Sequence, residues 1–207
     1  MQQYGTIHLG VDNYSTMGKK GPGYGGGQFP VDYGITAGII RYGQLSVEAG
    51  VDLVEPADEP LSMNLKAGIP EEFLFKNSPG VSVGIFNAGF RKYINDYNII
   101  NVVFSKTLPL GIGKFHGGLY AGSDTLKDGN GKVEKRGFML GYERYVYGDK
   151  LAVVLDYASG NNVIGGYGTA LNWFFSGKAS LLIGPVWFND AILNGPMKWT
   201  CQLDINF

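Results

Sequence analysis

Apolar and polar residues alternate one by one along many short segments of this chain. The segment 199–207 alternates without a fault. Its apolar side consists of Trp199, Cys201, Leu203, Ile205 and Phe207, and polar residues fill the other side. A period of two residues is that of a β-strand with one apolar and one polar face. Positions 45–53 repeat the pattern in the interior of the chain, which predicts an all-β protein.

About twelve segments show this pattern, each close to the ~9–11 residues that a tilted strand needs to cross a bilayer. Their apolar faces begin near Ile7, Tyr33, Leu45, Met63, Val81, Ile100, Phe115, Phe138, Leu151, Tyr167, Leu181 and Trp199. The alternation of the fifth segment breaks near Asn87, which predicts a β-bulge. Pro185 predicts a second bulge or a lipid-facing kink, because proline cannot donate to a strand ladder.

The connections between these segments alternate in length. Tight turns are expected at 42–43, 147–149 and 176–177, with a slightly longer one at 108–113, whereas the links 13–30, 55–60 and 124–136 are longer and more polar. This alternation is typical of an up-and-down antiparallel barrel with short periplasmic turns and long extracellular loops. An even number of strands then brings both termini to the periplasmic side. The link from Ile69 to Pro79 is long for that side.

Composition argues against a soluble barrel or sandwich, the plainest alternative. Charged residues are 17% of the chain, and 33 of the 207 residues are glycine, whereas a water-facing surface alone is ~25–35% charged. The net charge of -1 and the lack of a basic stripe give no field for nucleic acid. The single cysteine excludes an intrachain disulfide and a multi-cysteine zinc site.

The segment 199–207 resembles the C-terminal strand of Gram-negative outer-membrane β-barrel proteins. Those strands commonly end in an aromatic residue that the barrel assembly machinery recognises, and here that residue would be Phe207. The resemblance implies a single transmembrane β-barrel over residues 1–207 in the bacterial outer membrane. Its expected partners are the lipid bilayer with lipopolysaccharide and the assembly machinery, with no nucleic acid. A monomer is favoured. Met1 is interpreted as an initiating methionine added for expression in front of a mature chain.

Three cations support the expected orientation. Arg41, Lys106 and Arg144 fall on positions expected to face lipid, each at the periplasmic end of a strand. A cation there costs only ~0–1 kcal/mol, against ~2–4 kcal/mol at the bilayer midplane. Long side chains reach water from such positions.

A barrel of about twelve strands is intermediate between a filled eight-stranded barrel and a ~16–18-stranded aqueous channel. The expected inward face combines small residues with charges of both signs, which predicts a narrow water-filled pore. The candidate pore-lining residues are Glu48, Asp52, Lys66, Lys114, His116 and Asp156. Because acidic residues slightly outnumber basic ones, at most a weak preference for cations is expected. In the alternative arrangement, these charges pair across the lumen and help to plug it.

No catalytic, cofactor or metal site is expected. His8 and His116 are the only histidines, and neither has a serine two residues later as an outer-membrane phospholipase would need. The glycine-rich stretch 17–27 lacks the ending of a phosphate-binding loop, so a surface loop able to fold into the pore is expected. The stretch 128–131 lacks the spacing of a calcium loop, which favours a polar hairpin turn.

These features predict an outer-membrane channel for passive diffusion of ions or small polar solutes. The first alternative is a closed structural or adhesin-type barrel that acts through its extracellular loops. The second is an outer-membrane hydrolase that uses His8 or His116 with a nearby acid. The third is a conduit for apolar solutes, which would need an opening in the wall near Asn87 or Pro185.

Overall fold

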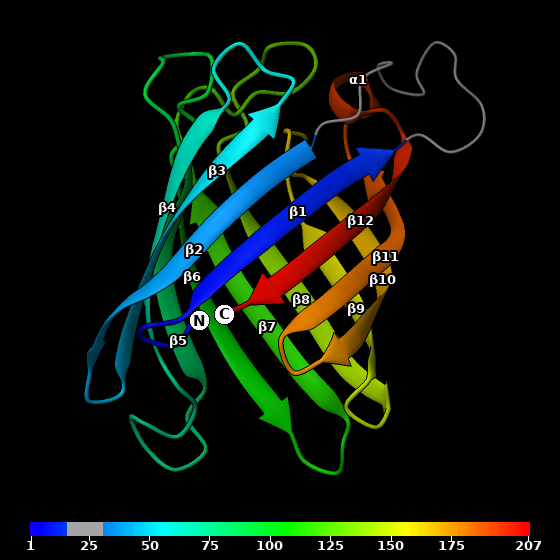
Figure 1. Cartoon of the computed structure of the whole chain (residues 1–207). Coiled ribbons are helices and arrows are strands. Elements are labelled where there is room, and N and C mark those ends of the chain that lie inside the picture. The colour runs from blue at the N-terminus through cyan, green and yellow to red at the C-terminus, as the bar shows by residue number, and fades with distance from the viewer. Residues whose placement is uncertain (16–30) are drawn as a thin grey trace.

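The computed structural model describes residues 1–15 and 31–207, which form a closed barrel of twelve antiparallel strands (Figure 1). Each strand pairs with its neighbours in sequence, and β1 closes the barrel against β12. The strands are β1 (Ile7–Ser15), β2 (Val31–Tyr42), β3 (Leu45–Glu55), β4 (Leu61–Ile69), β5 (Gly80–Ala88), β6 (Ile99–Leu108), β7 (Gly113–Ala121), β8 (Arg136–Tyr147), β9 (Leu151–Ala158), β10 (Gly166–Ser176), β11 (Ala179–Phe188) and β12 (Met197–Asn206). One short helix, α1 (Ala191–Asn194), joins β11 to β12. No helix among the described residues has the length and apolar character to cross a membrane.

The outer face of the barrel is apolar, as the alternation predicts. Leu119, Leu171 and Trp173 each expose more than half of their surface on this face. A soluble barrel would turn its apolar face inward, so that alternative is wrong. A continuous apolar exterior matches the hydrocarbon of a bilayer, where the closed ladder leaves no backbone group unpaired at a sheet edge.

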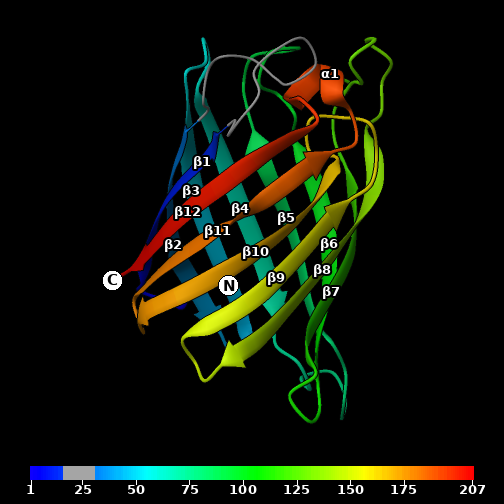
Figure 2. The ribbon, with the colours of Figure 1, turned by 90° about the vertical axis from the view of Figure 1, so that its right-hand side faces the viewer.

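The two ends of the barrel differ in the length of their connections (Figure 2). One end carries the turns 43–44, 109–112, 148–150 and 177–178, and both chain termini lie toward this end. The other end carries the connections 56–60, 89–98, 122–135, 159–165 and 189–196. The link 70–79 is the one long connection of the described residues at the turn end. That the turn end is periplasmic stays a prediction.

The register confirms the bulge expected near Asn87. Met63 pairs with Ala88 and Leu65 with Ile85, so β5 has one extra residue opposite β4. Asn87 adopts a left-handed backbone with φ 49°, and its N–H donates to Oδ1 of Asn64 at 3.1 Å. At Pro185 the register between β11 and β12 runs on without a shift, so this pair of strands has no bulge there.

A second bulge overturns the position expected for Arg41. The register between β2 and β3 shifts between Gly38 and Ile40, and beyond the shift Arg41 pairs with Ser46. Residues directly opposite in a ladder share one face of the sheet, and Ser46 lines the lumen. Arg41 therefore lies on the lumen face and not on the lipid face. Lys106 lies on the outer face as expected, opposite Phe115.

Candidate functional site

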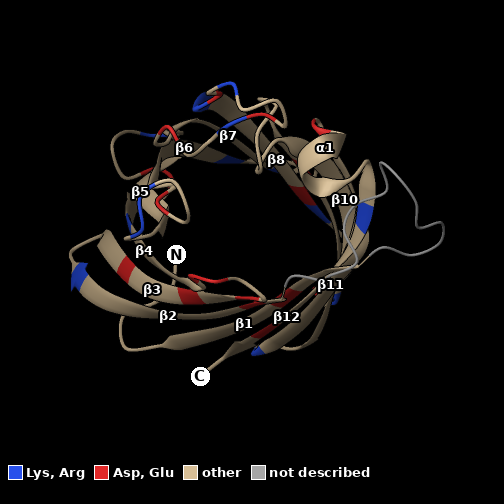
Figure 3. Cartoon of the chain, turned by 90° about the horizontal axis from the view of Figure 1, so that it is seen from above, with Lys and Arg blue, Asp and Glu red and all other residues tan. Residues whose placement is uncertain are grey.

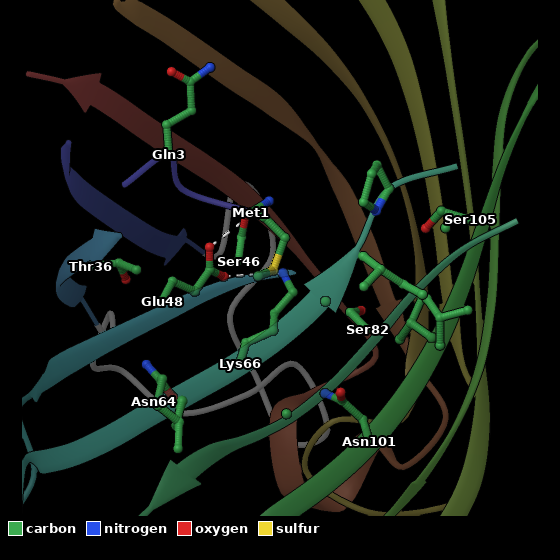
Figure 4. Close-up of a pocket in the computed structure, with 18 of the residues that line it drawn as sticks. Met1, Gln3, Thr36, Ser46, Glu48, Asn64, Lys66, Ser82, Asn101 and Ser105 are labelled. Atoms are coloured by element: carbon green, nitrogen blue, oxygen red, sulfur yellow. Dashed lines mark ion pairs between the residues drawn. The ribbon is translucent and has the colours of Figure 1, made fainter. Parts of the chain in front are cut away.

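The lumen contains a polar chamber of about 1010 Å³ bounded mainly by β2 to β7 (Figure 4). Its polar lining includes Thr36, Ser46, Glu48, Asn64, Lys66, Ser82, Asn101, Ser105, Lys114 and His116. Four of the six residues predicted to line the pore are thus brought together here. Asp52 lies on the same face of β3 as Glu48, and Asp156 lines a second cavity of about 410 Å³. Their part in conduction stays a prediction.

Glu48 and Lys66 form the central ion pair of the polar chamber. They are directly opposite on β3 and β4, and Nζ of Lys66 lies 3.2 Å from Oε1 of Glu48. The other carboxylate oxygen accepts a hydrogen bond from the backbone N–H of Gln2. The Glu48–Lys66 pair joins neighbouring strands of one wall, whereas the N-terminal ammonium of Met1, 3.9 Å from Oε2 of Glu48, comes from a segment inside the lumen. Whether these charges help to plug the lumen stays open between the two alternatives.

Carboxylates gather on the wall formed by β12, β1, β2 and β3 (Figure 3). Asp12 and Asp32 are direct cross-strand neighbours, and Asn64 donates a hydrogen bond to Asp52 on the next strand. On β12, Asp204 lies 3.2 Å from Nε2 of His8. Of these carboxylates, Asp52 is a predicted pore-lining residue, whereas Asp32 was not singled out from the sequence because it lies at the start of a strand just after the loop 13–30. This wall supplies an excess of negative charge to one side of the lumen.

The two histidines are engaged in lumen contacts. Oγ of Ser105 and Nδ1 of His116 are 2.7 Å apart, on directly opposed positions of β6 and β7. Nucleophilic catalysis needs a third group that orients the histidine, and within the described residues His116 forms no ion pair with a carboxylate. His8 has both ring nitrogens occupied, by Asp204 and by Oδ1 of Asn206. Among the described residues, the polar contacts of both histidines are with side chains that are their neighbours in the lumen.

The N-terminal segment 1–5 lies inside the barrel and narrows the polar chamber. Met1, Gln3 and Tyr4 are among the residues that line it, and Figure 4 shows Met1 beside Glu48, with the N-terminal ammonium 3.9 Å from Oε2 of that residue. Backbone hydrogen bonds attach this segment and the adjoining Thr6 to β2. The N–H of Gly5 donates to the carbonyl of Gly38 at 2.9 Å, and the N–H of Gly38 donates to the carbonyl of Thr6 at 3.1 Å. A Cβ at Gly38 would lie 2.0 Å from the carbonyl oxygen of Gln3, so only glycine permits this approach.

Loops fold inward over part of the opposite, loop-bearing end. Ile99, Tyr120 and Leu126 form a small buried apolar cluster, and Val163 and Ile164 pack against it. A hydrogen-bond network holds the connections together: Asn162, fully buried, donates to the hydroxyl of Tyr120 at 3.0 Å and to the carbonyl of Glu134 at 2.5 Å. The sequence analysis missed this cluster. The one hint of it in the sequence is Leu126, an apolar residue within a polar loop, which indicates a buried position.

The link 70–79 is fixed against the base of β6 by Glu71. The carboxylate accepts hydrogen bonds from the backbone N–H of Thr107 at 3.0 Å and from its hydroxyl at 2.8 Å, and Lys106 lies 3.5 Å away. Desolvation pushes the pKa of Glu71 upward. The bonds from Thr107, helped by Lys114 and Lys106, outweigh it and hold the pKa below its ordinary value.

The stretch 128–131 forms the expected polar hairpin. Lys127 and Val133 form an antiparallel bridge, and Oδ1 of Asp128 accepts from the N–H of Asn130 at 2.9 Å. Asp190, the N-cap of α1, also accepts from the N–H of Gly129 at 2.7 Å and thereby links two loops. No cluster of possible metal ligands occurs among residues 1–15 and 31–207. The surface loop expected at 17–27 lies outside the described residues.

The chain matches no protein-family model and no curated protein. Among solved structures, the KdgM porin has a TM-score of 0.58 at 7% identity, over 98% of this chain and 98% of the porin. The NanC porin has a TM-score of 0.58 at 7% identity, over 96% and 98% of the two chains. An outer membrane channel from Pseudomonas putida F1 has a TM-score of 0.54 at 13% identity, over 100% and 97%. The fold of this chain is therefore that of a porin-like outer-membrane β-barrel, and a place in the bacterial outer membrane is consistent with it.

Proposed function

We propose that this protein is a small outer-membrane channel for passive diffusion of ions or small polar solutes. The observation that carries the proposal is the polar chamber of about 1010 Å³ inside a barrel whose exterior is apolar. A hydrated lumen lowers the free energy of moving a polar solute across ~30 Å of hydrocarbon. No covalent step is needed, and the similar porins support this class of activity. Surrounding lipid and lipopolysaccharide, delivery by the barrel assembly machinery through Phe207, and action as a monomer belong to the same proposal.

The lining charges would set the selectivity. The carboxylates of Asp12, Asp32 and Asp204 lie on one wall, whereas the negative charge of Glu48 is offset by Lys66. Charged side chains that line a pore raise the local concentration of counter-ions. We therefore expect a modest preference for cations.

Single-channel conductance of the refolded protein in a planar bilayer, with a salt gradient across it, tests this proposal. Discrete current steps are expected, with a reversal potential of the sign for cations. Lys66→Glu, which adds negative charge to the chamber, should move that potential further in the same direction. Lys150→Glu is the matched control, because Lys150 lies exposed in a turn outside the lumen. A silent bilayer with folded, inserted protein would overturn the proposal.

A closed barrel that acts through its loops is the second candidate. The observation that favours it is the buried cluster of Ile99, Tyr120 and Leu126, which joins the connection 122–135 to the inner wall and against which Val163 and Ile164 of the connection 159–165 also pack. If this cluster and its neighbours seal the loop end, the folded protein would insert without conducting. The same conductance measurement therefore separates the two candidates.

A further inference from the structure

The second cavity of the lumen differs from the polar chamber in its lining. It has a volume of about 410 Å³ and lies against β8 to β12. Its apolar lining includes Met139, Val154, Val163, Ile164, Leu182, Val186 and Phe188. The interior of an open outer-membrane pore is ordinarily polar, so water alone does not explain these side chains. Mostly apolar cavities of ~300–1,000 Å³ with few polar groups are typical of small-molecule sites.

One carboxylate is placed at this apolar cavity. Asp156 is exposed to the lumen, and its direct neighbours across the ladders are Gly141 on β8 and Gly168 on β10, which leave space around it. Asp156 forms no ion pair with any described residue. Its carboxylate is therefore accessible from the cavity and can pair with a cationic group that enters it, through a charge-assisted hydrogen bond.

Two aromatic rings add to the fit for a cation. Tyr14 and Phe188 both line the cavity, with ring centroids 6.1 Å apart. An ammonium group near an aromatic face is stabilised by the ring quadrupole. Lys198 lies directly opposite Val186 on β12, but it is only 8% exposed and does not line the cavity.

We propose that this cavity binds a compact organic amine: an aromatic or aliphatic body lies against Val154, Leu182 and Val186, and its ammonium group pairs with Asp156. The binding site is separate from the polar chamber and from the Glu48–Lys66 pair. The proposed amine binding does not depend on whether the barrel conducts ions. An anion of the same shape is excluded by the charge of Asp156.

Fluorine NMR of protein in phosphatidylcholine nanodiscs tests the site, with 4-fluorobenzylamine as the probe and 4-fluorobenzoate as its anionic counterpart. The amine signal should broaden and shift on titration at pH 7, relative to empty nanodiscs, whereas the benzoate signal should not. Asp156→Asn should weaken amine binding by ~10-fold, because a charge-assisted hydrogen bond is lost. Asp149→Asn, in a turn outside the lumen, is the charge control.

A second pair of variants tests the apolar part of the site. Val186→Thr exchanges one methyl for a hydroxyl in the cavity and should weaken binding by ~5-fold. Val103→Thr makes the same change in the polar chamber and should leave it unchanged. Each of three results would overturn the proposed site: benzoate binds as tightly as the amine, Asp156→Asn binds the amine with unchanged affinity, or the amine does not bind. Amine binding to a barrel that is silent in bilayers would overturn the channel alone, and conduction without amine binding would overturn the site alone.

Discussion

Asp12 on β1 and Asp32 on β2 lie directly opposite each other on the lumen wall, and each has a buried carboxylate oxygen without a hydrogen-bond partner among the described residues. Like charges directly opposite in a ladder destabilise it, by an amount on the order of the ~0.2–1 kcal/mol of other cross-strand pairs. A sequence that breaks such a local rule commonly does so for function. The repulsion is explained if this wall concentrates cations in the lumen.

Asp32→Asn should therefore have two opposite effects. Removing one charge relieves the repulsion and should raise the free energy of unfolding by about 0.5 kcal/mol. The reversal potential in a salt gradient should move toward zero, because the wall attracts fewer cations. Urea unfolding from lipid vesicles and bilayer recording measure the two effects. Asp58→Asn, in the exposed connection 56–60, is the control, and an unchanged reversal potential in Asp32→Asn would contradict the role of this wall.

Gly38→Ala should displace the N-terminal segment from the lumen. The new Cβ would lie 2.0 Å from the carbonyl oxygen of Gln3, which is backbone and cannot turn aside without moving the segment. The polar chamber should widen, and single-channel conductance should rise, by roughly a factor of two if this segment forms the narrowest point. Gly10→Ala is the matched control, since its Cβ would have 3.6 Å to the nearest heavy atom, in His8. An unchanged conductance would show that the segment does not limit ion flow.

The barrel itself was predictable because lipid outside and water inside impose a period of two on most of each strand. The broken alternation at Asn87 also marked its bulge correctly. Arg41 shows the limit of this reasoning. The bulge of β2 falls at Ile39-Ile40, where two successive apolar residues hide the extra residue and shift the phase of everything after it. Only the pairing partner on β3 reveals which face Arg41 occupies.

The parts of the lumen made by segments outside the strands were not predictable. A period of two residues does not predict that residues 1–5 turn into the lumen. From the sequence, Gly38 resembles many other small inward-facing residues, and only its close approach to Gln3 in the structure shows why glycine is needed there. The buried cluster at the loop end depends on Leu126 meeting Ile99 and Tyr120 from distant strands. Of the six predicted pore-lining residues, four line the polar chamber, Asp156 lines the second cavity and Asp52 lines neither, since strand order gives the wall but not the shape of the space inside.

Leu126→Ala should loosen the loop end of the barrel. Leu126 is fully buried, and a buried Leu→Ala change costs about 2–5 kcal/mol. Because the loss falls on the connection 122–135, we expect local opening and not unfolding of the barrel. Limited proteolysis should cut this connection at least 10-fold faster, while heat-modified migration of the barrel in gels stays unchanged. Val133→Ala, in the same connection but exposed, should retain its resistance. Global unfolding of Leu126→Ala would contradict the local role.

Acidification should release the link 70–79 from β6. The pKa of Glu71 is lowered in the folded protein, so its anchoring is complete above the ordinary glutamate pKa of ~4.3 and is lost as the pH falls through the lower, folded value. The backbone N–H of Thr107 donates to this carboxylate, so its amide proton resonance should move upfield as Glu71 is protonated. Glu71→Gln should show the upfield position already at pH 7. Glu72→Gln, a more exposed neighbour on the same link, should titrate like the unmodified protein, and an amide of Thr107 that does not respond to pH would show that the anchor does not form.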